Sequence, residues 1–181
     1  DLPQEMSRDQ LEALIHQGPG AFGFGLGAAL AELDGVVGVH ASQPWQAAPP
    51  PAQLLPAGER MLLVLDQVLE QDPAKQVLTL KWKVSTEPDE LERCWLDQLM
   101  RKLPTTAKLR LDANGGWDRA TARSWLDALA NDPRLDWLEQ PLAIDDRAGL
   151  EQLAEIGPVA LDESLEQQPV LREQCLGWQV R

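Results

Sequence analysis

The chain has 181 residues, of which 44% are hydrophobic and 25% charged, and its formal net charge at pH 7 is −13. These proportions are ordinary for a globular protein, and no run of 18 or more apolar residues predicts a transmembrane helix. The negative charge argues against nucleic acid or an anionic membrane as a partner, because either would repel the chain.

The beginning of the chain and its cysteines indicate a cytoplasmic protein. The first residues, DLPQEMSRDQ, contain no basic stretch followed by an apolar one, so no signal peptide is predicted. They also lack an initiator Met, so we expect that the chain does not begin at a natural N-terminus. Cys94 and Cys175 have no CxxC spacing and are predicted to be buried or inert thiols in a reducing cytosol. His16 and His40 lack metal-ligand spacing, which argues against a histidine-based zinc site.

The first fifty residues predict two helices, over residues 7–17 and 19–35. The second contains glycines at positions 23, 25 and 27, but no strand precedes them, so close helix packing is favoured over a dinucleotide-binding loop. The proline-rich stretch over residues 43–58 is predicted to be an extended linker. We therefore expect one domain to end near residue 50 and another to begin at residue 51.

After the prolines, predicted helices and strands alternate. Apolar periodicity predicts helices over residues 59–71, 88–102, 118–130 and 146–156, and strands over residues 77–84, 108–112, 135–139 and 159–162, with another beginning at residues 177–180. This alternation is typical of right-handed βαβ units with a parallel sheet. Two such architectures compete, an open doubly wound sheet and a closed (β/α)₈ barrel.

Two of these helices have a predicted inward face. For residues 88–102 the face is expected to comprise Leu91, Trp95, Leu99 and Leu103, and Thr86 with Asp89 fits a capping box at the helix start. For residues 118–130 the inward residues are expected to be Ala122, Trp125, Leu126 and Leu129.

Each predicted strand ends in an ionisable residue. The residues are Lys83, Asp112, Glu139 and Asp162, at intervals of 29, 27 and 23 residues. In a parallel barrel the carboxyl ends of all strands lie on one rim, where active sites are built. Lys81 precedes Lys83 by two residues and therefore points to the same face of its strand.

The three acids at this rim predict a metal site. Converging carboxylates repel one another unless a cation lies between them, and single carboxylate ligands suit Mg²⁺. Alternatively, each acid is only a loop residue or a helix cap. Acids on three consecutive strands, beside two lysines on one face, favour the metal site. By the same alternation, Trp137 and Leu135 are expected to line the barrel interior together with Glu139.

Four motifs carry a family resemblance. The stretches KWK (81–83), LDANGGW (111–117), LEQPL (138–142) and ALDES (160–164) resemble the enolase superfamily, and more narrowly its muconate-lactonising-enzyme subgroup. Together with LLPAG (54–58), they are most similar to the family of o-succinylbenzoate synthases. The resemblance covers roughly residues 20–181.

The resemblance implies a fold and a metal. The implied fold is α/β, a partial (β/α) barrel made of the first five to six βα units in residues 51–181. Residues 1–50 would be the helical C-terminal part of an α+β capping domain. The implied metal ligands are Asp112, Glu139 and Asp162, holding Mg²⁺, with Mn²⁺ as the alternative ion.

The resemblance also implies a reaction. Lys83 matches the catalytic base, Lys81 an auxiliary lysine, and Asn114 a polar residue near the metal and the substrate. The implied enzyme is a hydro-lyase that dehydrates 2-succinyl-6-hydroxy-2,4-cyclohexadiene-1-carboxylate to o-succinylbenzoate in menaquinone or phylloquinone biosynthesis. Its partner would be a small-molecule carboxylate. The alternatives are a dipeptide epimerase or N-acylamino acid racemase of the same subgroup, and an inactive piece of a barrel.

Two departures from the family pattern stand out. The family has a further lysine at the end of the sixth strand, whereas this sequence stops at Arg181, so the lysine is expected beyond that residue or replaced by it. A complete (β/α)₈ barrel takes about 250 residues, so we expect the chain to be a fragment of a longer enzyme.

Overall fold

The computed structural model describes residues 5–18, 20–38, 51–71 and 78–167. The chain divides into two compact units, residues 1–50 and 51–181. Within the described ranges, no helix is both long and apolar enough to cross a membrane.

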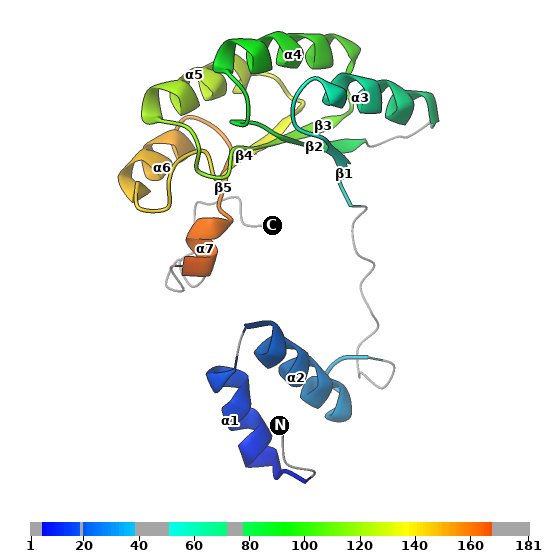
Figure 1. Ribbon diagram of the computed structural model, residues 1–181, viewed down its shortest axis with the longest axis vertical. Helices are drawn as coiled ribbons and strands as arrows, with labels where there is room; N and C mark the ends of the chain where they lie inside the picture. The colour runs from blue at the N-terminus through cyan, green and yellow to red at the C-terminus, as the bar shows by residue number, and fades with distance from the viewer. Residues whose placement is uncertain (1–4, 19, 39–50, 72–77, 168–181) are drawn as a thin grey trace. The chain divides into compact units, whose positions relative to one another are not determined.

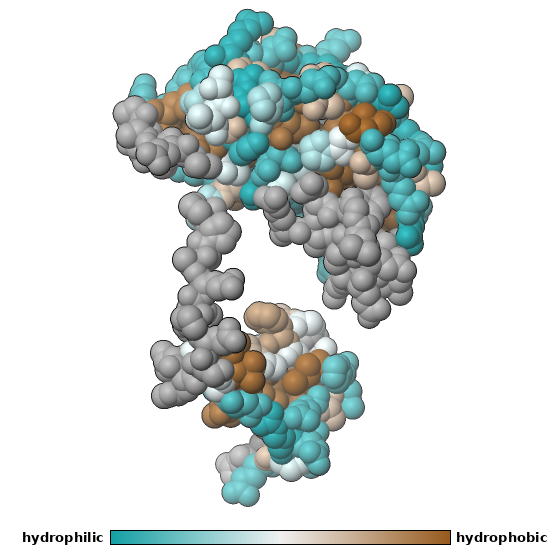
Figure 2. Space-filling model, turned by 180° about the vertical axis from the view of Figure 1, so that it is seen from behind, coloured by the Kyte–Doolittle hydropathy of each residue, from teal (hydrophilic) through white to brown (hydrophobic). Residues whose placement is uncertain are grey.

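The first unit is a pair of helices, α1 (Arg8–Gln17) and α2 (Gly20–Leu33), with Ser7 capping α1. A Cβ added to Gly23 would lie 2.4 Å from the carbonyl oxygen of Ile15. The glycine therefore lets the two backbones approach closely, which confirms at this position the predicted packing through small residues. Figure 2 shows apolar surface on this unit, where Phe24 and Leu33 are each 80% exposed.

The second unit is a parallel sheet covered by helices. Within residues 51–71 and 78–167, five strands pair in chain order, β1 (Gln53–Leu55), β2 (Thr79–Lys83), β3 (Lys108–Asp112), β4 (Leu135–Glu139) and β5 (Val159–Ala160). The helices between and after them are α3 (Arg60–Gln71), α4 (Asp89–Lys102), α5 (Arg119–Leu129), α6 (Arg147–Ala154) and α7 (Glu163–Gln167). Figure 1 shows α3, α4 and α5 over one face of the sheet. Among the described strands the order never reverses, as it would at the switch point of a doubly wound sheet, so the arrangement is that of a barrel wall.

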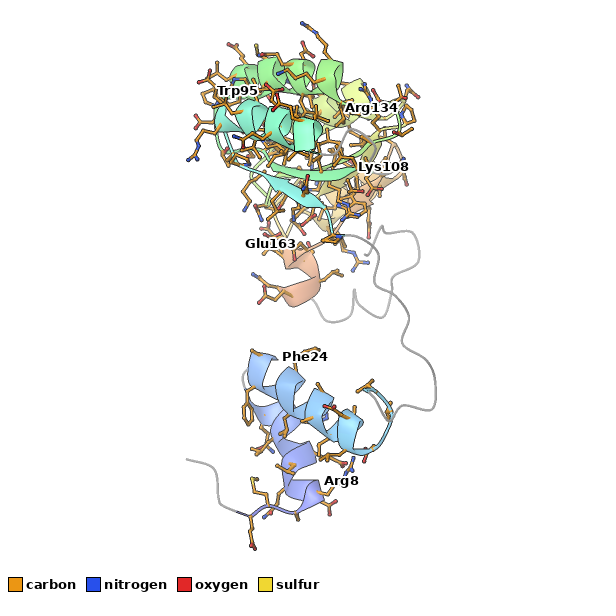
Figure 3. The ribbon with its side chains drawn as sticks, turned by 90° about the vertical axis from the view of Figure 1, so that its right-hand side faces the viewer. Arg8, Phe24, Trp95, Lys108, Arg134 and Glu163 are labelled. Atoms are coloured by element: carbon orange, nitrogen blue, oxygen red, sulfur yellow. The ribbon has the colours of Figure 1, made fainter. Side chains whose placement is uncertain are left out.

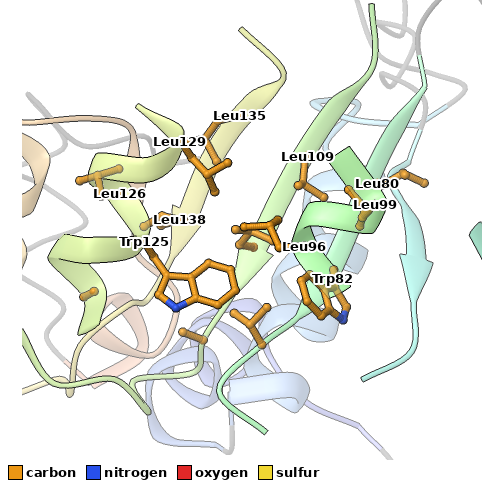
Figure 4. Close-up of a cluster of buried hydrophobic side chains, with 14 of the residues drawn as sticks. Leu80, Trp82, Leu96, Leu99, Leu109, Trp125, Leu126, Leu129, Leu135 and Leu138 are labelled. Atoms are coloured by element: carbon orange, nitrogen blue, oxygen red, sulfur yellow. The ribbon is translucent and has the colours of Figure 1, made fainter. Parts of the chain in front are cut away.

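The core lies between the sheet and these helices (Figure 4). In β2, Leu80 and Trp82 are fully buried on the helix side. The indole of Trp82 lies 6.4 Å from that of Trp125 on α5, which stacks on Trp117 at 4.9 Å. The four residues predicted to face inward on α5 are all buried. Burying large apolar side chains contributes roughly 1.5–3 kcal/mol each. Because side chains alternate along a strand, the opposite face of the strands is not needed for this core and can carry charged residues.

The start of α4 differs from the prediction. The helix begins after Pro88, and the capping box between Thr86 and Asp89 does not form. Instead, the fully buried carboxylate of Glu92 accepts hydrogen bonds from the backbone N–H groups of Ser85, Thr86 and Glu87 at 2.8, 2.9 and 3.1 Å. The loop after β2 folds over the first turn of α4, so that Glu92, inside the helix, accepts hydrogen bonds from the N–H groups of the loop.

The inward face of α4 agrees with the prediction at Leu99 and Leu103, which are buried, and at Trp95, which is partly buried against the core, but it differs at Leu91. Glu92, Leu96 and Leu99 are its buried residues, whereas Leu91 is 47% exposed. Because Glu92 is drawn inward by the loop N–H groups, its neighbour Leu91 turns toward solvent. Cys94 is exposed as well, so of the two predicted alternatives, a buried or an inert thiol, the buried one is wrong at this position.

Strand β1 was missed because its three residues lie among prolines and alanines and carry no periodic signal. It pairs with β2, and Leu55, opposite Trp82, is buried. Leu135 does not line the barrel interior, as the alternation predicted. An irregularity in the register next to Leu109 turns it to the helix side, where it joins the core.

Several predictions fall outside the described residues. They concern Cys175, His40, the strand over residues 177–180 and the end of the chain at Arg181.

Candidate active site

The two lysines of KWK lie on the face of β2 opposite the core. Trp82, between them, is buried among the helices, so Lys81 and Lys83 point to the other face, as predicted. Lys81 pairs in register with Arg110 of β3, and Lys83 with Asp112. The carboxyl end of β2 therefore presents its cations beside the acidic end of β3.

Lys81 joins two of the predicted metal ligands. Its Nζ atom lies 2.6 Å from Oε1 of Glu139 and 3.0 Å from Oδ2 of Asp112. The side chains of Lys81, Asp112 and Glu139 are 27%, 5% and 13% exposed. Three adjacent strands thus bring one ammonium and two carboxylates together at a largely buried point.

The protonation of Lys81 follows from these contacts. Desolvation is the largest single effect and lowers the pKa of this lysine. The hydrogen bonds that its ammonium donates to Glu139 and Asp112, together with the attraction of their negative charges, outweigh it and raise the pKa above its ordinary value of 10.5. Lys81 is therefore a permanent cation at neutral pH.

Asp162 belongs to the same electrostatic cluster. It follows β5, whose Ala160 pairs with Glu139. The pKa of Asp162 is raised above 3.8, first by desolvation and then by the negative charges of Glu163, Glu139 and Asp112, while Lys81 acts in the opposite direction. The carboxylates are close enough to disfavour one another's charge, and one ammonium does not neutralise them.

The donor set suits a hard divalent cation. Carboxylate oxygens are what Mg²⁺ prefers, and oxygens of Asp112 and Glu139 already converge on the single ammonium of Lys81. Within residues 5–18, 20–38, 51–71 and 78–167, no group of three or more His, Cys, Asp or Glu side chains is arranged closely enough to hold a metal ion. By chemistry and charge the three carboxylates still suit the ion, and two of them, Asp112 and Glu139, meet at one point.

Lys83 lies on a cavity of about 640 Å³ at this end of the sheet. Lys81 and Asp112 also line the cavity, and the remaining lining residues are Leu54, Leu55, Pro56, Ala57, Arg60 and Val64. The wall is thus apolar on the side of β1 and cationic on the side of β2, which suits an acid with an apolar body. The sequence did not predict that Arg60 lines this cavity, because Arg60 is the first residue of α3 and lies outside the motifs that carry the resemblance.

Asn114 is held beside the cluster. Its backbone has φ = 47°, and its N–H group donates to Oδ1 of Asp112 at 3.2 Å. Its side-chain amide donates to Oε1 of Glu163 at 2.6 Å. Figure 3 labels Glu163, the first residue of α7, and Lys108, the first residue of β3. Asn114 thus links the loops after β3 and β5 on the side of the sheet that carries the carboxylates.

The family follows from the sequence match. The model of the enolase C-terminal domain-like family matches residues 65–174. The chain belongs to this family.

Similar family members include two curated proteins and a solved structure. An o-succinylbenzoate synthase of Thermosynechococcus vestitus is 40% identical over 128 residues, covering 68% of this chain and 37% of that protein. A hydrophobic dipeptide epimerase of a Flavobacteria bacterium is 39% identical over 94 residues, covering 49% of this chain and 26% of that protein. The structure of an o-succinylbenzoate synthase from Thermosynechococcus elongatus BP-1, with Mg in its active site, matches with a TM-score of 0.68 and 31% identity, over 99% of this chain and 56% of that one. This chain therefore spans well under half the length of the curated relatives.

Proposed function

We propose that the protein is an o-succinylbenzoate synthase, and that residues 51–181 supply its metal ligands and catalytic base. It would dehydrate 2-succinyl-6-hydroxy-2,4-cyclohexadiene-1-carboxylate to o-succinylbenzoate in menaquinone or phylloquinone biosynthesis, in the cytoplasm. The observation that carries the proposal is the convergence of Lys81, Asp112 and Glu139 from three adjacent strands beside Lys83. The similarity to o-succinylbenzoate synthases supports it. We also propose that residues 1–50 are the C-terminal part of a capping domain.

In this proposal Asp112, Glu139 and Asp162 hold Mg²⁺, with Mn²⁺ as the alternative. When bound, the ion supplies positive charge that stabilises the negative charge developing on the substrate carboxylate. Lys81 keeps two of the ligands in place through its hydrogen bonds and adds a fixed cation of its own. Asn114 fixes Asp112 through its backbone N–H group.

Lys83 performs the proton transfers. Neutral Lys83 takes the proton from the carbon next to the substrate carboxylate, and the electrons of that C–H bond move into the carboxylate as an enediolate. These electrons then form the ring double bond while the C–O bond to the hydroxyl breaks. The ammonium of Lys83 returns the proton to the departing hydroxyl, so that water leaves and the ring becomes aromatic.

The base assignment is tested by Lys83→Ala in the full-length protein. We expect turnover to fall by at least about 10²- to 10⁴-fold, the usual contribution of a general base. Mg²⁺ affinity, measured by calorimetry, should be nearly unchanged because Lys83 binds no carboxylate of the cluster. Lys102→Ala, an exposed lysine on α4, is the matched control and should keep full turnover. Retained turnover in Lys83→Ala would contradict the assignment.

A second candidate is epimerisation of a hydrophobic dipeptide, favoured by the 39% identity to the flavobacterial epimerase. The same metal and Lys83 would act, and a base on the opposite face would return the proton. The two reactions separate cleanly in D₂O. Deuterium incorporation into a dipeptide, without dehydration of the cyclohexadiene, would identify the epimerase and overturn the synthase.

A further inference from the structure

Gln140 follows the proposed metal ligand Glu139 and is fully buried. Its backbone has φ = 38°, a left-handed conformation that residues other than glycine rarely adopt. Non-glycine residues hold such conformations only where the surrounding contacts impose them. The contacts around Gln140 therefore indicate what the conformation serves.

The side chain of Gln140 uses both ends of its amide. Oε1 accepts hydrogen bonds from the backbone N–H groups of Asp162 and Ser164, at 3.2 and 3.1 Å. Nε2 donates to the carbonyl oxygen of Leu142 at 3.0 Å and to Oγ of Ser164 at 2.8 Å. Ser164 is also fully buried. One side chain just after β4 thus holds the backbone of the loop after β5, at the residue proposed to bind the metal.

The backbone of Gln140 bonds to β5 on one side and to the loop after β3 on the other. Its N–H group donates to the carbonyl of Ala160 at 2.9 Å, and its carbonyl accepts from the N–H group of Gly115 at 2.7 Å. Ala160 lies two residues before Asp162, and Gly115 three after Asp112. The carboxyl ends of β3, β4 and β5, each carrying one of the three acids, therefore meet at this residue.

We propose that Gln140, together with Ser164, is a positioning pair that sets the spacing of Asp162 to Glu139 and Asp112 for the metal. The inference rests on the proposed function. Neither residue lines the cavity beside Lys83. Glutamine is required because its oxygen must accept two N–H groups while its nitrogen donates to a carbonyl. A glutamate at this position would face the Leu142 carbonyl with an acceptor, and an apolar side chain would leave two buried N–H groups without a partner.

The pair is tested by metal affinity in the full-length protein. Gln140→Met keeps the volume but removes the amide, and we expect the Kd for Mn²⁺, measured by electron paramagnetic resonance, to rise about 10- to 100-fold, as for other partners that orient metal ligands. Excess Mg²⁺ should restore much of the turnover lost by this variant. Ser164→Ala removes one hydrogen bond and should shift the Kd in the same direction by less.

The control separates positioning from general stability. Leu129→Ala creates a cavity near the end of α5, in the helix-side core, and should lower the melting temperature without changing the Kd for Mn²⁺. If Gln140→Met and Ser164→Ala both bind Mn²⁺ as the wild type does, the inference is overturned. If Gln140→Met does not fold, the Kd of Ser164→Ala decides alone.

The variant Asp112→Asn distinguishes failure of the positioning pair from failure of the proposed function. Loss of Mn²⁺ binding in Asp112→Asn, with unchanged binding in the Gln140 and Ser164 variants, rejects the positioning pair and leaves the metal centre standing. A wild-type protein that binds no Mn²⁺, or an Asp112→Asn variant that binds it normally, rejects both.

Discussion

At the scale of single residues, two lysines with the same spacing and chemistry have different surroundings. Lys81 is enclosed by Asp112 and Glu139, and the pKa of its ammonium is raised by them. Lys83 is exposed at the end of β2 and, among the described side chains, forms no ion pair within 4 Å. Lys81 is therefore fixed between two carboxylates, whereas Lys83 lines the cavity, where we propose that it acts as the base.

Arg60 provides a second test at this scale. It is an exposed cation on the same cavity as Lys83, and we expect it to bind a carboxylate of the substrate away from the reacting carbon. A hydrogen bond to a charged group contributes roughly 1.5–3 kcal/mol, so Arg60→Gln should raise KM about tenfold or more, with kcat little changed. Arg123→Gln, on α5 and outside this cavity, is the control. An unchanged KM would exclude Arg60 from substrate binding.

At the scale of elements, buried polar side chains hold the loops that follow the strands. Glu92 on α4 binds the N–H groups of the loop after β2, and Gln140 does so for the loop after β5. The left-handed residues Ser85, Asn114 and Gln140 all stand within two positions of the end of a strand that carries a proposed site residue. Irregular backbone is thus concentrated at the rim and stabilised there by hydrogen bonds from neighbouring elements.

The opposite end of the sheet is held by Arg134, before β4. Figure 3 shows Arg134 and Lys108 at the same end of the unit. The Arg134 guanidinium donates to the carbonyls of Met100 and Leu103 at 2.6 and 3.0 Å, at the C-terminus of α4, and pairs with Asp132 at 2.7 Å. The guanidinium lowers the pKa of Asp132 below its ordinary value of 3.8.

This pair predicts a dependence of stability on pH. A carboxyl group whose pKa is lower in the folded state stabilises the fold above its unfolded pKa and loses that contribution as the pH falls through its folded pKa. Asp132→Asn should therefore be less stable than the wild type at pH 7, and the difference should shrink as the pH falls below about 4. Urea unfolding at a series of pH values measures this. A difference that is independent of pH between 2 and 7 would contradict the role of the pair.

At the scale of the whole molecule, the proposed site gathers like charges from separate parts of the chain. Asp112 and Asp162 are fifty residues apart, and the chain already carries a net charge of −13. Holding several carboxylates near one ammonium costs free energy, and the pKa of Asp162 is raised, first by desolvation and then by the neighbouring negative charges. A divalent cation bound there would offset this repulsion, so metal binding and folding stability should be coupled.

We therefore expect Mg²⁺ to raise the melting temperature of the protein. A ligand at a concentration of 100 Kd stabilises the folded state by roughly 2.7 kcal/mol. Differential scanning calorimetry in Mg²⁺ and in EDTA measures the effect, and Asp112→Asn should abolish it. An equal shift in Asp112→Asn would mean that the ion acts elsewhere on this acidic chain.

Much of the fold and of the candidate site could be read from the sequence, because both depend on local periodicity and on chain order. A period of two placed Trp82 in the core and both lysines on the other face, and strands that follow one another in parallel brought Asp112 beside Glu139. The errors at Leu91 and Leu135 have a common origin. Periodicity predicts that one face of an element is buried, but a polar loop or a register shift decides which residues that face contains.

The sequence by itself determined that Lys83, Asp112, Glu139 and Asp162 stand at the ends of successive strands, since strand spacing and order are properties of the chain. Only the tertiary structure decided which side chains meet. Lys81 contacts Glu139 across 58 residues, and the buried amide of Gln140 matches N–H groups that the loop after β5 leaves without backbone partners. A buried polar side chain is defined by the groups it satisfies, and those groups come together only when the strands and loops have packed.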